Sequence, residues 1–155
     1  MYVLRHPVIV LLLCSLIAVI GGCGQPERLI LESAGQSDRF IEIGDTNSFS
    51  LRYTHSVEKT PVIESFRILD NGKLLLFSTA YKSYGVGLPS LPEEGTLRVS
   101  DGWLLLENLH REYSEIKLRV GPEAAVSIEL SNKTYPIYQW YTAGSLVVIR
   151  KDFHR

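Results

Sequence analysis

Cysteine is almost absent from this sequence. Its 155 residues include only Cys14 and Cys23, and both lie close to the N-terminus. After Cys23 the chain therefore has no thiol for a disulfide, a redox pair or a thiolate metal site. This absence excludes zinc fingers and nucleophilic cysteine catalysis from the rest of the chain.

A surplus of charge of either sign is also absent. The sequence has 16 basic and 17 acidic side chains, so its formal net charge is −1. No basic stripe is visible along the chain. Nucleic-acid binding therefore has no electrostatic support, and we expect no nucleic-acid partner.

The first residues have the charge order of an exported protein. Arg5 precedes an apolar run from Val8 to Ile20, and no acidic residue occurs before Glu27. This order is typical of a secretory signal, and the run is shorter than the roughly 20 apolar residues that span a bilayer comfortably. The run ends in IGGC, residues 20–23, which resembles the bacterial lipobox.

Lipoprotein processing at this motif would cleave before Cys23 and acylate its thiol. More than one acyl chain makes an anchor stable, so we expect a protein that is lipid-anchored in a cell membrane and faces the periplasm or the cell exterior. The alternative is an uncleaved single-pass anchor. Cleavage would remove Arg5 and no acid, which changes the formal charge from −1 to −2. The expected organisation is a signal peptide over 1–22, the lipidated cysteine and a tether over 23–37, with room for one first strand, and one domain over 38–155.

Beyond Arg39 the sequence lacks a helical stripe and repeats a strand pattern instead. Runs of β-branched and aromatic residues alternate with Gly, Asn and Asp turns. This pattern predicts an all-β domain, either a single antiparallel β-sandwich or a partly open β-barrel.

The register of the first three strands follows from two predicted turns. If Glu58–Pro61 forms a four-residue hairpin loop, His55 lies opposite Glu64. A type I′ turn at Asn71-Gly72 then places Thr79 on the other side of Glu64. One polar row is therefore expected among three apolar or aromatic rows on the core face.

This polar row has two interpretations. It is a structural hydrogen bond that fixes the register, or it is a site in which Glu64 orients His55 toward a proton, a metal or a ligand carboxylate. One histidine and one glutamate are too few ligands for a metal site, so we expect none. On the other face the same register places Arg52 opposite Arg67, either as two solvated side chains or around a shared anion.

A long connection, KSYGVGLPSLPEEG at residues 82–95, follows the third strand. Loops of this length are usually functional or disordered, and this one lacks the polarity of a disordered segment, so we expect an ordered loop. Its glycine spacing is not that of the dinucleotide fingerprint. The candidate interaction or ligand residues are His55, Glu58, Glu64, Thr79, Tyr84, Gly85, Gly87 and Pro89.

Three further features are expected in the second half. Asp101-Gly102 predicts a hairpin between TLRV and WLLLE. EIKLRV and AVSIEL, residues 115–120 and 125–130, are expected to form another hairpin through GPEA. The aromatic run TYPIYQWY, residues 134–141, is expected to pack in the core rather than to form a sugar-stacking platform or a membrane-facing rim.

Catalytic motifs are missing. Ser56 follows His55 directly, so on a strand the two side chains point to opposite faces and cannot form a nucleophile–base pair. The sequence has no GxSxG elbow and no evident pair of glycosidase carboxylates. We therefore expect a protein without enzymatic activity and without a cofactor.

Three motifs together resemble a known family. YTHSVEKTPVIESFRI at 53–68, KSYGVGLPS at 82–90 and DGW at 101–103 are similar to the small exported bacterial proteins grouped as the domain-of-unknown-function family eighteen-fifty. Such proteins are commonly encoded beside TRAP transporters whose solute-binding protein is of the TAXI class. No catalytic residues are established for the family.

The resemblance implies a non-enzymatic accessory role beside a TAXI-type TRAP transport system for organic anions. Its expected partners are the lipid bilayer, through acylated Cys23, and the membrane subunit or the solute-binding protein of the transporter. The alternative is an extracytoplasmic module that binds a small ligand, either an organic anion or a metal.

Overall fold

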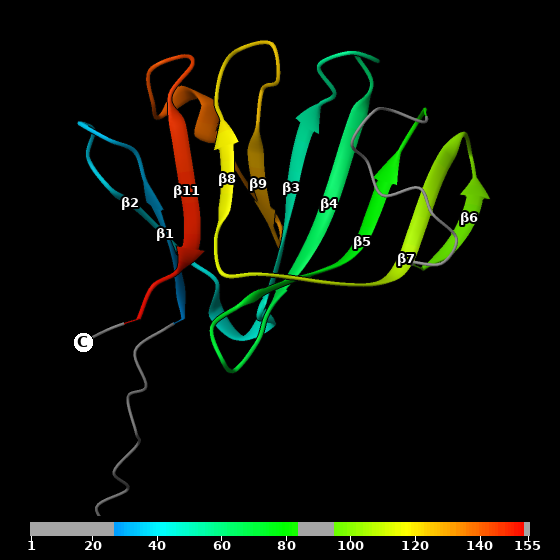
Figure 1. Cartoon of the computed structure of the whole chain (residues 1–155), viewed down its shortest axis with the longest axis horizontal. Helices are drawn as coiled ribbons and strands as arrows, with labels where there is room; N and C mark the ends of the chain where they lie inside the picture. Colours follow the sequence, from blue (N-terminus) through cyan, green and yellow to red (C-terminus); the bar gives the residue numbers. More distant parts are fainter. Residues whose placement is uncertain (1–26, 84–94, 154–155) are drawn as a thin grey trace, which may run out of the picture.

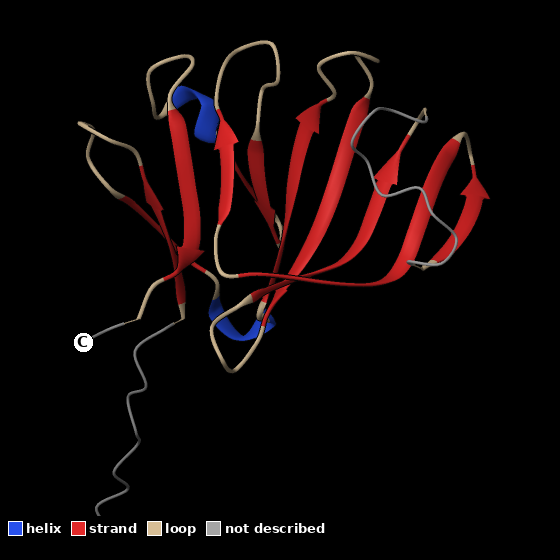
Figure 2. Cartoon of the chain, in the orientation of Figure 1, coloured by secondary structure: helices blue, strands red, loops and turns tan. Residues whose placement is uncertain are grey.

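The structure, a computed structural model, describes residues 27–83 and 95–153 of the chain. Within these residues, eleven strands form two antiparallel sheets that face each other (Figure 1). Strands and loops account for nearly all of this region, together with two single-turn 3-10 helices (Figure 2). The two sheets do not close into a barrel, so the all-β sandwich is the fold that the chain adopts.

The small sheet has four strands in the order β2-β1-β11-β8. It joins the two ends of the described chain, because β1 pairs with β11. β1 lies in the segment that the sequence assigned to a tether with room for one strand. The bounds are Arg28–Glu32 for β1, Arg39–Glu42 for β2, Ile116–Arg119 for β8 and Leu146–Lys151 for β11.

The large sheet has seven strands in the order β10-β9-β3-β4-β5-β7-β6. Its bounds are Ser48–Thr54 for β3, Pro61–Ile68 for β4, Leu74–Tyr81 for β5, Thr96–Ser100 for β6, Trp103–Tyr113 for β7, Ser127–Leu130 for β9 and Lys133–Tyr135 for β10. The 3-10 helices are η1 at Gly44–Thr46 and η3 at Ile137–Gln139.

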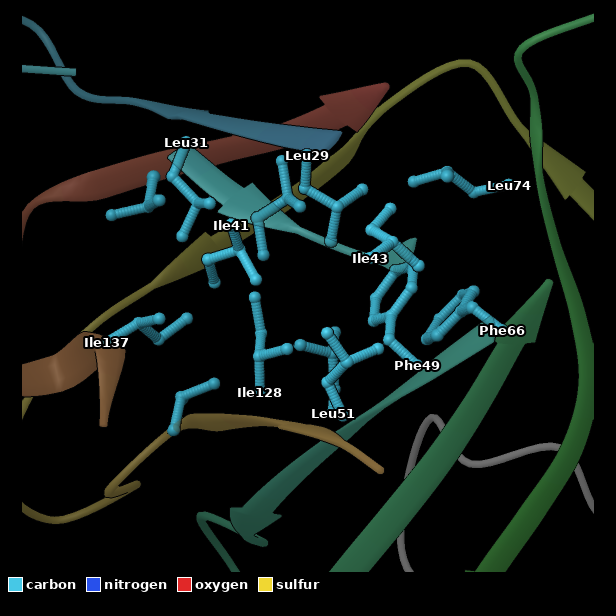
Figure 3. Packing of buried hydrophobic residues seen from close by; sticks show 14 of the residues in the cluster. Leu29, Leu31, Ile41, Ile43, Phe49, Leu51, Phe66, Leu74, Ile128 and Ile137 are labelled. Carbon is cyan, nitrogen blue, oxygen red and sulfur yellow. The ribbon is translucent and has the colours of Figure 1, made fainter. Parts of the chain in front are cut away.

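The core lies between the two sheets (Figure 3). Alternate residues of each strand point inward, as the period of two requires. From the small sheet come Leu29, Leu31 and Ile41, and from the large sheet Leu51 and Ile128, all at most 2% exposed. The interdigitation of these side chains supplies most of the apolar burial that holds the sheets together.

The first hairpin was predicted on the correct faces but in the wrong register. Leu51, not His55, lies opposite Glu64. The backbone N–H of His55 donates to the Thr60 carbonyl at 2.8 Å, so the turn is made by Ser56–Lys59. The shift is an even number of residues, which leaves every side chain on its predicted face.

The second hairpin does not form the predicted type I′ turn, but a bulge later in β5 restores the predicted register. Asn71 does not have a positive φ, whereas Gly72 does, and Leu69 pairs with Lys73 across a three-residue loop. The extra loop residue shifts the register by one, and a bulge at Phe77 shifts it back. Beyond the bulge the predicted pairing of Glu64 with Thr79 is therefore confirmed.

The predictions for the second half had mixed outcomes. Asp101 and Gly102 both have positive φ and join Ser100 to Trp103, so this hairpin is confirmed. The hairpin between the runs at 115–120 and 125–130 is wrong, because β8 pairs with β11 in the small sheet while β9 pairs with β3 in the large one. The connection between them crosses from one sheet to the other.

The two arginines of the outer face are not opposed. Arg52 lies opposite Ile63 and is 3.7 Å from the carboxylate of Glu129. Arg67 stacks over the ring of Phe77, 5.3 Å from its centroid. The predicted pair, and with it the shared anion, is therefore wrong.

The aromatic run near the C-terminus packs against the core, as predicted. Tyr141 is 5% exposed, and its hydroxyl donates to the Leu31 carbonyl of β1 at 2.8 Å. This bond ties the segment after η3 to the small sheet. The hydroxyl of nearby Tyr138 only accepts an exposed hydrogen bond from Gln139.

These two tyrosines give a matched test of the fold. We expect Tyr141→Phe to lower the free energy of unfolding by about 1–2 kcal/mol, because a buried carbonyl loses its donor. Tyr138→Phe should change it by less than about 0.5 kcal/mol, as surface substitutions do. Chemical denaturation of both variants checks this, and equal losses would contradict it.

Candidate functional site

The two sheets differ in width, and this difference creates the candidate site. The small sheet ends at β8, which lies toward the β9–β3 side of the large sheet, while β4, β5, β7 and β6 continue past it (Figure 1). Two adjoining cavities of about 360 Å³ and 170 Å³ run along β8. Both are lined by Glu64, Ile116 and Lys117. We call them together the inter-sheet trough.

The walls of the trough are mainly apolar. Leu51 and Tyr53 contribute from β3, Ile116 and Leu118 from β8, and Val126 from the connection before β9. The smaller cavity adds Phe66, Leu76 and Tyr113. A small number of polar groups in an apolar hollow is the usual composition of a binding site.

The polar floor of the trough is a tyrosine–glutamate pair. Tyr53 is diagonal to Glu64 across the β3–β4 ladder, and its hydroxyl donates a hydrogen bond to the Glu64 carboxylate. Burial raises the pKa of Glu64, although the Tyr53 hydrogen bond and the charge of Arg111 oppose the shift. Burial also raises the pKa of Tyr53, and the adjacent carboxylate adds to that effect.

Thr79 lies beside this pair but does not join it. It is opposite Glu64 on β5 and has no exposed surface. Its Oγ1 has no hydrogen-bond partner within the described part of the chain. Thr79 therefore gives no hydrogen bond to the Glu64 carboxylate, and the donor is Tyr53, which was not among the predicted site residues.

His55 lies at the rim of the trough rather than on its floor. Its Nδ1 accepts the backbone N–H of Val57 at 3.3 Å and of Glu58 at 3.2 Å, while its carbonyl accepts that of Lys59 at 3.0 Å. An accepting Nδ1 carries no proton, so the ring is in the Nε2–H tautomer. The imidazole thus caps its own turn, and the predicted cross-strand pair with Glu64 is wrong.

The turn after His55 is connected to the neighbouring loops. The Ser83 hydroxyl donates to the Glu58 carboxylate at 3.4 Å, and Lys59 is 3.8 Å from the Glu123 carboxylate. Val57 is 65% exposed at the tip.

The edge of β8 forms one long side of the trough. No strand of the described residues pairs with this edge, which leaves a row of backbone N–H and C=O groups for another partner. Lys117 and Arg119 alternate with the inward-facing Ile116 and Leu118. Lys117 contacts Glu115 at 2.6 Å, and Arg119 donates to the Gly144 carbonyl at 3.0 Å.

Several predicted features are not part of this geometry. Cys23, Tyr84, Gly85, Gly87 and Pro89 lie outside the described residues. Within residues 27–83 and 95–153, no group of three or more His, Cys, Asp or Glu side chains could hold a metal ion. The same residues contain no helix that is long and apolar enough to cross a membrane.

Comparison with protein families gives one match. The model of a domain of unknown function, DUF1850, matches residues 49–137. The chain belongs to this family. The matched segment contains every residue that lines the trough, whereas β1, β2 and β11 of the small sheet lie outside it. No curated protein and no solved structure matches this DUF1850 protein.

The raised pKa of Glu64 predicts a pH-dependent stability. Between the unfolded-state pKa of about 4.3 and the higher folded-state pKa, the folded protein binds more protons, so stability falls as pH rises. Glu64→Gln keeps an acceptor for Tyr53 but cannot ionise. We expect its free energy of unfolding, relative to wild type, to increase between pH 4 and pH 8.

Glu112 provides a control of opposite sign. Its exposed carboxylate bonds to Lys73, which lowers the pKa of Glu112. Glu112→Gln should therefore lose a small amount of stability relative to wild type as pH rises. Denaturant titrations at both pH values measure the differences. A Glu64→Gln difference that does not change with pH would show that the carboxyl is not destabilised by burial.

The role of His55 is tested by two substitutions. His55→Phe removes the acceptor of two backbone N–H groups and should cost about 1–2 kcal/mol of stability. His55→Asn offers an amide oxygen near the position of Nδ1 and should recover most of that loss. Amide exchange at Val57 and Glu58 should accelerate only in the Phe variant, and equal exchange in both variants would contradict the cap.

Proposed function

We propose that this DUF1850 protein is a non-enzymatic, membrane-anchored interaction module that binds an extended segment of a partner protein along β8. The observation that carries the proposal is the edge of β8 beside the inter-sheet trough, which pairs with no other strand of residues 27–83 and 95–153. An edge strand is a template for another strand, and β-strand addition is a common mode of peptide recognition.

The geometry favours an extended backbone over other occupants. Only a strand supplies N–H and C=O groups at the spacing that the β8 edge requires. The four residues of β8 span about 13 Å, enough to fix the register of a short segment. Such a segment would be the fifth strand of the small sheet and would cover more of the large one.

The trough also predicts which side chains the segment carries. Alternate residues of an added strand would point toward the large sheet. There they would contact Leu118 of β8 and, on the floor of the trough, Leu51 or Phe66. Apolar side chains suit these positions. One polar side chain among them would meet the Tyr53–Glu64 pair, which otherwise leaves a carboxyl partly desolvated.

The anchor expected at Cys23 indicates on which side of the domain, relative to the membrane, a partner would bind. β1 starts at the same end of the sandwich as η1, and the backbone of Ile43 bonds to that of Glu27. Four residues reach about 14 Å, so an acylated Cys23 holds this end near the bilayer. The turn at Ser56–Lys59 is at the opposite end (Figure 1), which favours a partner in the extracytoplasmic space.

We assign this role to a TAXI-type TRAP transport system, with its solute-binding protein as the preferred partner and its membrane subunit as the second. The assignment follows the genomic neighbourhood that the resemblance to DUF1850 proteins implies, and this chain belongs to that family. The accessory protein would then act on the delivery of organic anions without binding them covalently or converting them.

A second candidate is supported by the larger cavity alone. Its volume of about 360 Å³ is that of a small-molecule site. The Tyr53–Glu64 pair would orient the polar end of the ligand, and Lys117 and Arg119 at the mouth favour an organic anion.

Hydrogen exchange of the full-length protein in detergent micelles distinguishes the two candidates. Addition of the solute-binding protein should slow exchange at the β8 amides that face the trough and leave the β6 edge unchanged. An organic anion should bind without protecting the β8 backbone. Binding of the solute-binding protein with no protection of β8 would contradict strand addition.

Two exposed serines provide matched variants for the same experiment. Ser56 lines the mouth of the trough, and Ser100 is the last residue of β6, next to the turn to β7. Ser56→Trp should weaken binding of the partner at least tenfold by blocking the mouth. Ser100→Trp should leave the affinity unchanged, and an equal effect of both would place the interface elsewhere.

A further inference from the structure

A row of polar side chains crosses the outer face of the large sheet, on the side away from the trough. Successive pairs in the ladders place one residue of each strand in this row. In spatial order the row is Thr134, Glu129, Ser50, Ser65, Ser78, Glu107 and Thr96. We call it the hydroxyl row. Its centre consists of three serines, the smallest hydroxyl side chains, on adjacent strands.

A cavity of about 230 Å³ lies at one part of this row. It is lined by Ser48, Ser50, Ser65, Ser131, Glu129, Phe49 and Phe77. The lining thus combines four hydroxyls and one carboxylate with an aromatic wall. At about 30 Å³ per molecule of liquid water, the volume corresponds to roughly eight waters, or one sugar ring.

The aromatic wall is Phe77 of β5, and the bulge at this residue keeps Ser78 on the same face. Leu76 points into the core, and both Phe77 and Ser78 then lie on the outer side, because the bulge inserts one residue. Arg67 stacks over the Phe77 ring at 5.3 Å and holds it beside the serines. Without the bulge Phe77 would still follow the inward-facing Leu76 onto the outer face, but Ser78 would point inward and leave the row.

The charges of the row are compensated. Glu129 is paired with Arg52 at 3.7 Å, and Glu107 with Arg98 at 3.1 Å. Ser50 and Ser65 share one hydrogen bond at 3.1 Å, which leaves each hydroxyl with further capacity. The surface therefore offers both donors and acceptors, and both of its carboxylates are paired with arginines.

We propose that this cavity is a binding site for a neutral saccharide. Hydroxyls that both donate and accept match the hydroxyls of a sugar in either sense. The Phe77 ring offers an apolar face on which the C–H face of the ring packs. Glu129 accepts from sugar hydroxyls, and as an acceptor-only group it offers no donor to the carboxylate of an anionic sugar.

The site is independent of the trough. Ser50 and Leu51 are neighbours on β3 and point to opposite faces, so the large sheet separates the two surfaces. Failure of strand addition along β8 therefore says nothing about saccharide binding, and the reverse also holds.

Saturation-transfer difference NMR on the full-length protein tests the proposal. The protein is kept in a detergent without a sugar head group, because maltosides would compete. The probes are methyl glycosides of a neutral hexose, of an N-acetylhexosamine and of a hexuronate, each at millimolar concentration. Saturation should reach ring protons of at least one neutral glycoside, with at least tenfold weaker binding of the hexuronate.

The variants separate the cavity from the rest of the row. Ser50→Ala combined with Ser65→Ala should weaken binding at least tenfold, and Phe77→Leu should do so without removing a hydroxyl. Ser78→Ala removes a hydroxyl of the same row outside the cavity and should leave binding unchanged. Circular dichroism confirms that each variant is folded.

Three results would overturn the proposal. The first is the absence of saturation transfer to both neutral glycosides in the wild-type protein. The second is saturation transfer in the double serine variant and in Phe77→Leu that is as strong as in the wild-type protein, which would show that the sugar binds elsewhere. The third is preferential binding of the hexuronate, which the carboxylate of Glu129 should oppose.

Discussion

The unequal width of the two sheets is the constraint on which the rest of this structure depends. A β-sandwich buries its core only where both sheets overlap, and here four strands face seven. β8 is the last strand of the small sheet, so one side of it pairs with β11 while the other borders the trough. Within the described part of the chain, the same mismatch leaves one edge of β8 without a paired strand and opens an apolar hollow next to it.

Burial of the Tyr53–Glu64 pair on the floor of the trough lowers the stability of the fold, and this cost points to a role in binding. Glu64 would be more stable in solvent, and its raised pKa reflects the free energy that burial takes from the ionised form. An apolar residue opposite Leu51 would pack without this loss. Tyr53 offsets part of the cost by its hydrogen bond, and a bound segment or ligand with a complementary group would offset more.

Alternation along each strand was predictable from the sequence, whereas pairing was only partly so. In the first hairpin the side chains lie on their predicted faces, because the true register differs from the predicted one by an even number of residues. Asp101-Gly102 formed the expected turn since both residues adopt positive φ, but at Asn71-Gly72 only the glycine does. No local pattern shows that β8 and β9 belong to different sheets, because sheet membership depends on contacts distant in sequence. The free edge beside the trough was missed for that reason.

The bulge at Phe77 links the two faces of the large sheet. On the inner side it cancels the one-residue shift of the Asp70–Gly72 loop, so that Thr79 remains level with Glu64 beside the trough. On the outer side it keeps Ser78 beside Phe77, so that the serine row is continuous. A regular β5 with the same loop would leave Phe66 opposite Leu76 but would place Ser78, not Thr79, opposite Glu64. One inserted residue thus preserves both the core-facing pattern beyond Leu76 and the hydroxyl row on the opposite face.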